Sequence, residues 1–511
     1  MATPSEGLPQ AEGSAAAQPP VGLLDKIVLQ GKMVRDVTQQ TYARELVEEF
    51  ASQLTGGGMM TVGSTSIQVL PDSMTIGPDT VTSIKTRIAQ IDEAISLQLN
   101  EIMHHPDFQA LEAAWRGLNY LVMNSETGTH LKIRLLNLTK KELLNDMEKA
   151  TEFDQSVMFN KIYEDEYGTF GGNPYSVLIG DFEFGRHPQD TAILEKISGV
   201  AAAAHAPFIA AASPKLFDWD GFTEMNLPRD LAKIFETAEL IKWRSFRETE
   251  DSRYVTLTMP RMLLRLPYGP DTVPVEGVNY VEDVDGRDHS KYLWGNSAYA
   301  LGTRITDAFA KYRWCAAIRG VEGGGLVEGL PAHTFKTDNG DIALKCPTEL
   351  AITDRREKEL NDIGFISLCH CKGTDYAAFF GGQSTNKAKK YNTNQANANA
   401  RISSMLPYVL AASRFAHYLK VIMRDKIGSF MTRENVQNYL NTWISQYVLL
   451  SDDAPQAVKA QFPLREARVD VSDMPGKPGC YTAVVFLKPH FQLDELTVSI
   501  RLVAELPPPA K

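Results

Sequence analysis

YSVLIGDFEFGRHPQDTAILEKISGVAAAAHAPFIAAA, residues 175–212, decides the fold class of this 511-residue chain. An apolar run at 176–179 precedes a charged turn, an alanine-rich helical stretch and a second apolar run at 207–211. Two buried strands joined by a crossover helix form a βαβ unit, whose parallel sheet needs helices on both faces. The sequence therefore predicts a mixed α/β protein.

The turn after the first predicted strand gathers reactive side chains, among them Asp181, Glu183, His187 and Asp190. Such groups at the end of a buried strand are typical of α/β enzyme sites. The sequence offers no nucleophile elbow, metal triad or phosphate loop to complete a mechanism. The alternative is that Pro188 begins a helix and Asp190 lies near its N-terminal dipole. We favour this capping role over an enzyme that uses the Asp181, Glu183 and His187 turn.

Composition and charge argue against several other classes of protein. Lys and Arg number 52 against 63 Asp and Glu, and the net charge of −11 disfavours a surface built for nucleic acid. No apolar run reaches the length of about 20 residues that spans a membrane, so we expect no direct membrane insertion. The N-terminus has no basic segment of the secretory type. We therefore expect a cytoplasmic protein.

The five cysteines form no CxxC pair, so reduced thiols are expected. Cys369, His370 and Cys371 lie in a strand-like run, where the cysteines face one side and the histidine the other. Three metal ligands could not then converge, and no fourth is supplied nearby. We expect Cys369 and Cys371 to belong to the core, and we expect neither a metal nor a cofactor.

Four segments are expected along the chain. Residues 1–22 should be disordered, 23–78 should form an arm helix and glycine linker, 79–385 a central α/β domain, and 386–511 a C-terminal domain. The arm helix packs either on a partner or on its own chain. Within the central domain, residues 130–138 alternate like a strand, and Thr139 with Glu142 forms a capping box. A strand at 254–266 is broken by Pro260, which suggests an edge or a bend.

In the C-terminal segment, two stretches with the apolar spacing of helices are followed by stretches with the alternating pattern of strands. Helices are expected at 402–427 and 433–450, and the first carries Arg414, Lys420 and Arg424. These cations form either a solvated face or a docking site for an acidic protein surface. Residues 465–471, 481–488 and 496–503 then read as three strands of a small antiparallel meander. Its unfilled edges are templates for a strand from another subunit.

Long blocks of the chain resemble one protein family. They are GDFEFGRHPQD (180–190), AHAPFIAAASP (204–214), IKWRSFRETEDSRYVTLTMPRMLLRLPYG (241–269), KYRWCAAIRGVEGGGLVEGLP (311–331), GFISLCHCKGTDYAAFF (364–380), SRFAHYLKVIMRDKIGSF (413–430) and CYTAVVFLKPHFQLDELTVSIRLV (480–503). They are similar to the large subunit of the type VI secretion system contractile sheath, the VipB/TssC family. The likeness covers residues 81–506.

The resemblance implies a structural protein of the cytoplasm of Gram-negative bacteria, with no catalytic centre and no cofactor. It would pair with a small sheath subunit, and the heterodimers would stack into a helical sheath around an inner tube of hexamers, on a baseplate. Contraction would propel the tube and its effectors into a target cell, and an AAA+ ATPase would disassemble the contracted sheath. The implied fold is sheath-like, with a helical N-terminal region, a central βαβ-containing domain and a C-terminal sheet completed by neighbouring subunits.

The resemblance also implies where subunits join. In such sheaths, terminal strands of one protomer enter a sheet of the next. Carried over to this chain, the strand-exchange residues are Val469, Val471, Tyr481, Ala483, Val485, Leu496, Val498, Ile500 and Leu502. Arg414, Lys420 and Arg424 are the candidate contacts with the inner tube.

Overall fold

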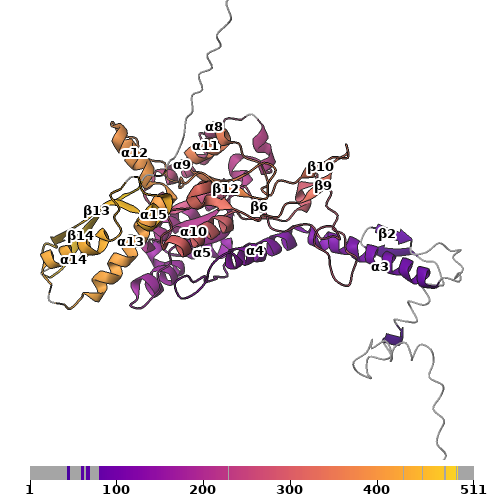
Figure 1. Ribbon diagram of the computed structural model, residues 1–511, viewed down its shortest axis with the longest axis horizontal. Helices are drawn as coiled ribbons and strands as arrows, with labels where there is room; N and C mark the ends of the chain where they lie inside the picture. The colour runs from indigo at the N-terminus through magenta and orange to yellow at the C-terminus, as the bar shows by residue number, and fades with distance from the viewer. Residues whose placement is uncertain are drawn as a thin grey trace, which may run out of the picture. The chain divides into compact units, whose positions relative to one another are not determined.

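The computed structural model describes residues 43–45, 59–62, 65–68, 80–227, 229–429, 431–451, 453–476, 479–490 and 492. The chain forms two compact units: Met1–Met103 with Tyr268–Asp283, and His104–Pro267 with Val284–Lys511 (Figure 1). The expected boundary at 385/386 falls inside the second unit. The disorder predicted for 1–22 and most of the predicted arm helix lie outside the described residues.

The first unit is built around helix α3 (Thr80–Met103). Strands β1 (Met59–Val62) and β2 (Thr65–Gln68) form an antiparallel hairpin where a glycine linker was expected. Asn100 of α3 accepts hydrogen bonds from the Tyr280 hydroxyl at 2.9 Å and from the Asp283 N–H at 3.1 Å. Residues 268–283 are thereby held on α3.

The second unit contains a six-stranded sheet in the order β3-β4-β5-β11-β12-β8. The first four strands are parallel: β3 (Leu178–Phe184), β4 (Phe208–Ala212), β5 (Val255–Met259) and β11 (Phe365–His370). The last two, β12 (Ala377–Phe379) and β8 (Leu326–Val327), are antiparallel to their neighbours. Helix α7 (Pro188–Ala204) connects β3 with β4, which confirms the predicted βαβ unit.

The remaining elements of this unit surround or extend the sheet. The other helices are α4 (Pro106–Met123), α5 (Lys140–Lys149), α6 (Val157–Phe159), α8 (Leu231–Ile234), α9 (Ile241–Glu248), α10 (Ala298–Tyr312), α11 (Asp354–Asp362), α12 (Asn394–Ser403), α13 (Leu406–Asp425), α14 (Arg433–Ser445) and α15 (Gln456–Gln461). Short helical turns include η3 (Asn160–Gly168) and η7 (Asp251–Tyr254). Paired strands are β6 (Met262–Leu263) with β7 (Trp294–Gly295), β9 (Thr334–Lys336) with β10 (Ile342–Leu344), and β13 (Leu464–Asp473) with β14 (Tyr481–Pro489).

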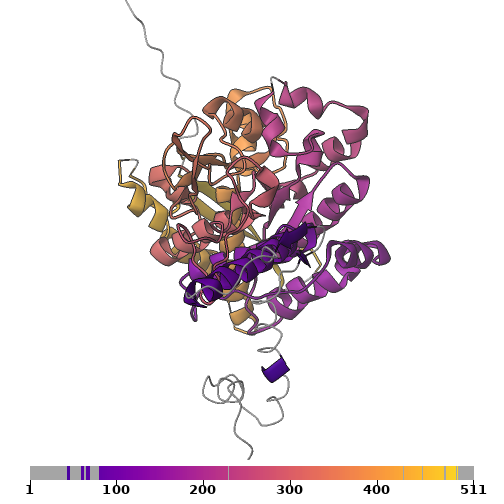
Figure 2. The same cartoon turned by 90° about the vertical axis from the view of Figure 1, so that its right-hand side faces the viewer.

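Successive side chains of the sheet pack alternately in two separate hydrophobic cores. Phe208 and Ala210 of β4 pack in one hydrophobic cluster with α7 and α9, whereas Ile209 between them packs in another with α10. Because successive strand residues point to opposite faces, a sheet buried on both sides must be apolar throughout. Every residue of β4 and β5 is accordingly buried. Figure 2 shows helices on both sides of the central strands.

The C-terminal elements pack in a third cluster. Helices α13 and α14 and strands β13 and β14 lie together at one end of this unit (Figure 1). Trp314 stacks on Phe415 of α13 at 4.3 Å between ring centroids, and Leu440 of α14 and Val469 of β13 complete the centre. Among the described residues, no helix is both long and apolar enough to cross a membrane.

Three local predictions differ from the structure. Strand β3 continues through residues 180–184, which were predicted as a turn. Gly180 allows the Phe208 ring to approach closely, since a Cβ there would lie only 2.5 Å from it. Residues 130–138 form no strand, and Leu135 is 66% exposed. Pro260 follows the end of β5 as predicted, and of the two alternatives, an edge or a bend, the edge is wrong because β5 lies between β4 and β11.

Candidate functional site

The charged stretch at the end of β3 begins helix α7. His187 is the N-cap residue, and its Nδ1 accepts a hydrogen bond from the Gln189 N–H at 3.3 Å. Pro188 occupies the first turn, where its missing N–H would have had no helical partner. Asp190 Oδ2 accepts a hydrogen bond from the Gly185 N–H at 2.7 Å. The capping role predicted for this stretch is confirmed.

The carboxylates of the same stretch have separate partners. Glu183 accepts two hydrogen bonds from the Arg261 guanidinium, 2.5 Å from Nε and 2.7 Å from Nη2. Asp181 accepts one from Asn296 at 3.4 Å, and burial raises the pKa of its carboxyl group. Within the described part of the chain, no hydrogen bond or ion pair joins His187 to either carboxylate. The three groups therefore do not form the acid–base pair that an enzyme would need.

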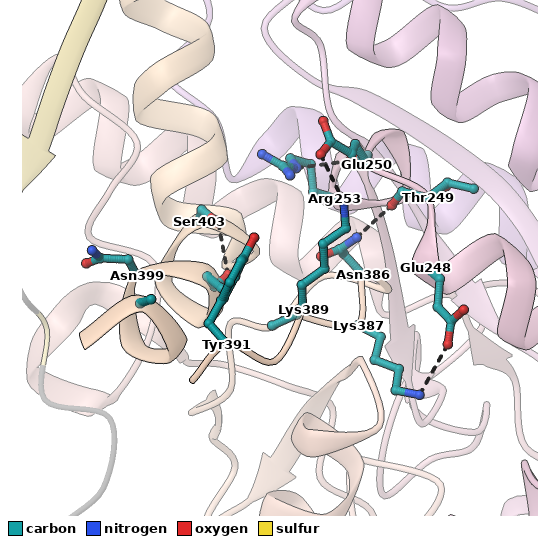
Figure 3. Close-up of a pocket in the computed structure, with 13 residues that line it drawn as sticks. Glu248, Thr249, Glu250, Arg253, Asn386, Lys387, Lys389, Tyr391, Asn399 and Ser403 are labelled. Carbon is teal, nitrogen blue, oxygen red and sulfur yellow. Dashed lines mark hydrogen bonds and ion pairs between the residues drawn. The ribbon is translucent and has the colours of Figure 1, made fainter. Parts of the chain in front are cut away.

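A cavity of about 410 Å³ lies between the end of α9, η7 and the segment that leads into α12 (Figure 3). Its two lysines face glutamates: Lys387 Nζ is 3.4 Å from Glu248, and Lys389 Nζ is 3.3 Å from Glu250. The lining residues include neither histidine nor cysteine. Both lysines are paired with glutamates, and no lining histidine or cysteine is present to act as a base or nucleophile.

A buried polar joint lies next to this cavity. Asn386 Nδ2 donates to the Thr249 carbonyl at 2.7 Å and to Ser252 Oγ at 2.8 Å. Thr385 Oγ1 donates to the Ser252 carbonyl at 2.9 Å, and Arg247 Nε donates to the Thr385 carbonyl at 2.8 Å. Burial lowers the pKa of Arg247 to about 10. These groups satisfy one another, as buried polar groups must, so they form a structural joint.

The Cys369–Cys371 triplet does not assemble a metal site. Cys369 is buried in β11, and His370 Nε2 lies 2.8 Å from the Thr374 carbonyl. Cys371 is exposed because β11 ends at His370, so the expectation that both cysteines belong to the core is wrong for Cys371. Throughout the described ranges, no three His, Cys, Asp or Glu side chains are grouped to hold a metal ion.

The basic side chains of α13 contact other parts of the chain. Arg414 Nη1 donates to Ser176 Oγ at 3.1 Å. Lys420 Nζ lies 3.3 Å from the Tyr167 ring centroid, a cation–π contact. Arg424 Nη2 donates to the Tyr167 carbonyl at 2.9 Å. These contacts give the three cations a packing role, and their contact with an inner tube stays a prediction.

His417 of α13 lies among these cations and is 3% exposed. Its Nε2 is 2.9 Å from the Ala204 carbonyl, and its ring centroid is 6.2 Å from that of His205. Burial lowers the pKa of His417 to about 4, and the positive charges of Arg414 and Lys420 act in the same direction. The folded chain therefore holds this imidazole neutral.

We expect acidification to destabilise the chain through His417. Between pH 6.5 and 4 the unfolded chain binds a proton at this histidine and the folded chain does not, so folding stability falls as the pH falls. The loss reaches about 3 kcal/mol at pH 4, since each pKa unit corresponds to about 1.4 kcal/mol. Urea unfolding of the wild type and of His417→Gln at several pH values measures it.

The difference in unfolding free energy between these two proteins should shrink or reverse as the pH falls below 6.5. The matched control is His130→Gln, because His130 is exposed. Parallel pH profiles for wild type and His417→Gln would contradict a neutral buried His417.

The predicted tail sheet is present as a hairpin. Val469 and Val471 of β13 are buried, and Val469 lies directly opposite Val485 of β14, as Val471 lies opposite Ala483. Tyr481 packs against the same cluster. The structure thus brings these five predicted residues together. Leu496, Val498, Ile500 and Leu502 lie outside the described residues.

Comparisons with known proteins match most of the chain. The VipB family model described as a tail sheath N-terminal domain matches residues 85–386, and a second one described as a tail sheath gpW/gp25-like domain matches residues 395–506. The type VI secretion system sheath protein TssC1 of Pseudomonas aeruginosa is 52% identical over 444 residues, which cover 86% of this chain and 89% of that protein.

Solved structures of contractile injection systems are also similar. The anti-feeding prophage baseplate contains a chain with 10% identity and a TM-score of 0.35, covering 73% of this chain and 83% of that one. The contracted sheath complex of an extracellular contractile injection system, PVC, contains one with 10% identity and a TM-score of 0.32, covering 60% and 68%.

Proposed function

Since this chain belongs to the VipB family of tail sheath proteins, and is a structural sheath subunit rather than an enzyme, we propose that it is the large subunit of a type VI secretion contractile sheath. The match of two sheath family models to residues 85–386 and 395–506 carries this proposal. The alternative enzyme at Asp181, Glu183 and His187 is not supported, because those side chains cap α7 or pair with Arg261 and Asn296.

The proposed partners are those of a contractile sheath. The chain pairs with a small sheath subunit, and the heterodimers polymerise into a helical sheath around hexamers of an inner tube, on a baseplate. The sheath acts in the cytoplasm of a Gram-negative bacterium, and an AAA+ ATPase disassembles it after contraction. Two packings of the same interfaces differ in free energy, and that difference drives contraction without nucleotide hydrolysis by this chain.

Neighbouring subunits are linked by strand exchange at the C-terminal hairpin. Strands β13 and β14 pair only with each other among the described strands, so they form a sheet of the minimum size. A two-stranded hairpin is marginal by itself and gains from a further strand. Residues 496–503 alternate between apolar and other side chains, as an added strand would. We keep 79–385 and 386–511 as the proposed division of the sheath body, since the two family models match on either side.

Co-expression with the small sheath subunit tests the function. We expect the two chains to copurify and to form long tubes in negative-stain electron microscopy, because each heterodimer carries the linking hairpin. The chain expressed alone is the control and should give fewer and shorter assemblies. Discrete particles of uniform size from the co-expressed pair would contradict a sheath subunit.

A further inference from the structure

The two edges of the β13–β14 hairpin are not equivalent. Val469 lies opposite Val485, and Arg468 lies opposite Phe486. In an antiparallel pair, alternate residues direct their N–H and C=O groups toward the partner strand and the residues between direct them outward. The N–H and C=O of Val469 and the N–H of Val471 form hydrogen bonds with side chains of α14 and not with β14. Val469 and Val471 therefore direct their backbone groups to the outer edge of β13. By the same alternation, Ala483, Val485 and Leu487 present the outer edge of β14.

Helix α14 covers the outer edge of β13 with side-chain amides. Asn441 Oδ1 accepts from the Val469 N–H at 2.9 Å, and Asn441 Nδ2 donates to the Val469 carbonyl at 2.8 Å. Gln437 Oε1 accepts from the Val471 N–H at 3.3 Å. The Asn441 amide thus makes the pair of hydrogen bonds that a residue of a third strand would make.

The spacing along helix and strand explains why one helical stripe can do this. Positions four apart on a helix are about 6 Å apart along its axis, and positions two apart on a strand are about 6.6 Å apart. Asn441, Gln437 and Arg433 therefore run in step with alternate residues of β13. The third of them, Arg433, has its guanidinium 3.8 Å from the Asp473 carboxylate.

The beginning of β13 is covered as well. The segment that follows α14 forms two backbone hydrogen bonds with Leu464. The Leu464 carbonyl accepts from the Leu449 N–H at 2.8 Å, and the Leu464 N–H donates to the Tyr447 carbonyl at 3.3 Å. The backbone edge of β13 is thus engaged at Leu464, Val469 and Val471, and the Arg433–Asp473 ion pair lies beside it at the end of the strand.

The outer edge of β14 has no such cover. Over the described residues, no hydrogen bond engages the outward N–H and C=O groups of Ala483, Val485 and Leu487. On the solvent face of the same strand, Val484 is 58% exposed and Phe486 is 66% exposed. An open row of backbone groups beside exposed apolar side chains is what an added strand needs.

We propose that the Arg433–Gln437–Asn441 stripe closes the β13 edge and directs the exchanged strand of a neighbouring copy onto the β14 edge. The occupant is residues 496–503 of a second copy of this chain, whose alternating Leu496, Val498, Ile500 and Leu502 match a half-buried strand. This inference rests on the proposed strand exchange and specifies which edge receives the strand.

The end of β14 favours a second copy over the chain's own tail. Gln492 N–H donates to the Tyr408 hydroxyl at 3.2 Å, and Gln492 Nε2 donates to the Ala316 carbonyl at 2.8 Å. Tyr408 lies in the first turn of α13 and Ala316 follows α10, so these bonds hold Gln492 on those two elements. We therefore assign the strand at the β14 edge to a second copy.

Disulfide trapping between two copies tests the choice of edge. One copy carries Val484→Cys or, as the matched control, Asp470→Cys, two exposed positions that lie directly opposite each other. The other copy carries a single cysteine at one of positions 497–501, and both copies carry Cys371→Ser and Cys480→Ser, because these two cysteines are exposed. The copies are co-expressed with the small subunit and oxidised within the assembled sheath.

A strand at the β14 edge lies about 5 Å from position 484 and about 10 Å from position 470, and a disulfide needs Cα atoms within about 7 Å. We expect an intermolecular disulfide with Val484→Cys at least tenfold stronger than with Asp470→Cys. The reverse preference would overturn the proposal. A disulfide that forms only when both cysteines are in the same chain would also overturn it, because the occupant would then be the chain's own tail.

Opening the closed edge gives a second measurement. In Gln437→Ala with Asn441→Ala, we expect the Asp470→Cys disulfide to appear while the Val484→Cys disulfide remains. No change in the Asp470→Cys signal would show that the amides do not guard the edge. Deletion of 496–503 distinguishes a failure of strand exchange from a failure of the edge assignment. Normal sheaths without this segment would reject strand exchange itself. If the deletion abolishes sheaths but the full-length chain is trapped at Asp470→Cys, only the choice of edge is rejected.

Discussion

Deleting residues 496–503 is expected to abolish sheath formation while the heterodimer still copurifies. If this segment is the exchanged strand, as we propose, its loss removes about four ladder hydrogen bonds at about 1 kcal/mol each, before any apolar burial is counted. Every link between subunits is then weakened by about three powers of ten. Because a tube needs many links in series, tubes should fall below detection in electron microscopy.

The matched control removes residues 504–511, which follow the predicted strand and include three consecutive prolines. This truncation should leave the number and length of tubes unchanged, since proline cannot donate to a ladder. Sheaths of normal length from the 496–503 deletion would contradict the strand-exchange role. Loss of copurification with the small subunit would instead place this segment in the heterodimer interface.

Phe365→Ala should cause a large loss of stability. Phe365 is 0% exposed in β11, with its ring centroid 5.1 Å from that of Phe217, 5.7 Å from that of Phe235 and 6.1 Å from that of Trp243. Truncating a fully buried phenylalanine costs about 3–5 kcal/mol, because the transfer free energy is lost and a cavity is left. That is a large part of the about 5–15 kcal/mol that stabilises a typical domain.

Urea unfolding followed by circular dichroism measures this loss. Phe365→Leu should cost only about 1 kcal/mol, since it keeps most of the volume. Phe170→Ala is the exposed control, because Phe170 is 77% exposed, and it should change stability by less than about 0.5 kcal/mol. A cost for Phe365→Ala no larger than that of Phe170→Ala would mean that the ring cluster around β11 does not stabilise the fold.

Elements with a strong local pattern could be predicted from the sequence. The βαβ unit was found because two apolar runs flank a helical stretch of the right length, and α5 because Thr139 and Glu142 form a capping box that the structure contains. The β13–β14 hairpin was found because its apolar residues alternate on either side of a glycine- and proline-rich turn. In each case the local signal and the tertiary packing agree.

Other features depend on contacts that no local pattern records. Residues 130–138 alternate like a strand, yet no strand in the described part of the chain pairs with them, and a strand needs a partner to form. The helix predicted over 402–427 is divided between α12 and α13, because Met405 adopts an extended backbone as the N-cap of α13. Gly180 was taken as a turn residue, although it serves the close approach of Phe208.

The residues that cover the β13 edge were missed for the same reason. Gln437 and Asn441 are four apart on α14, each one position after the buried Val436 and Leu440. Such a polar stripe beside an apolar one is ordinary for a surface helix. Only the position of β13 shows that these amides bind backbone. The one signal that could have pointed to them is their spacing, because an amide recurs after four residues beside the apolar stripe of the helix.

A hairpin with one covered edge and one open edge can accept only one added strand, and in this sense its valence is one. Each subunit can then accept a single strand and donate a single strand, so a series of linked subunits has a head and a tail and cannot branch. If both edges were open, a subunit could accept two strands, and the product would be a network instead of a line. By leaving a single acceptor edge, the amide stripe of α14 would in this way keep a series of linked subunits unbranched.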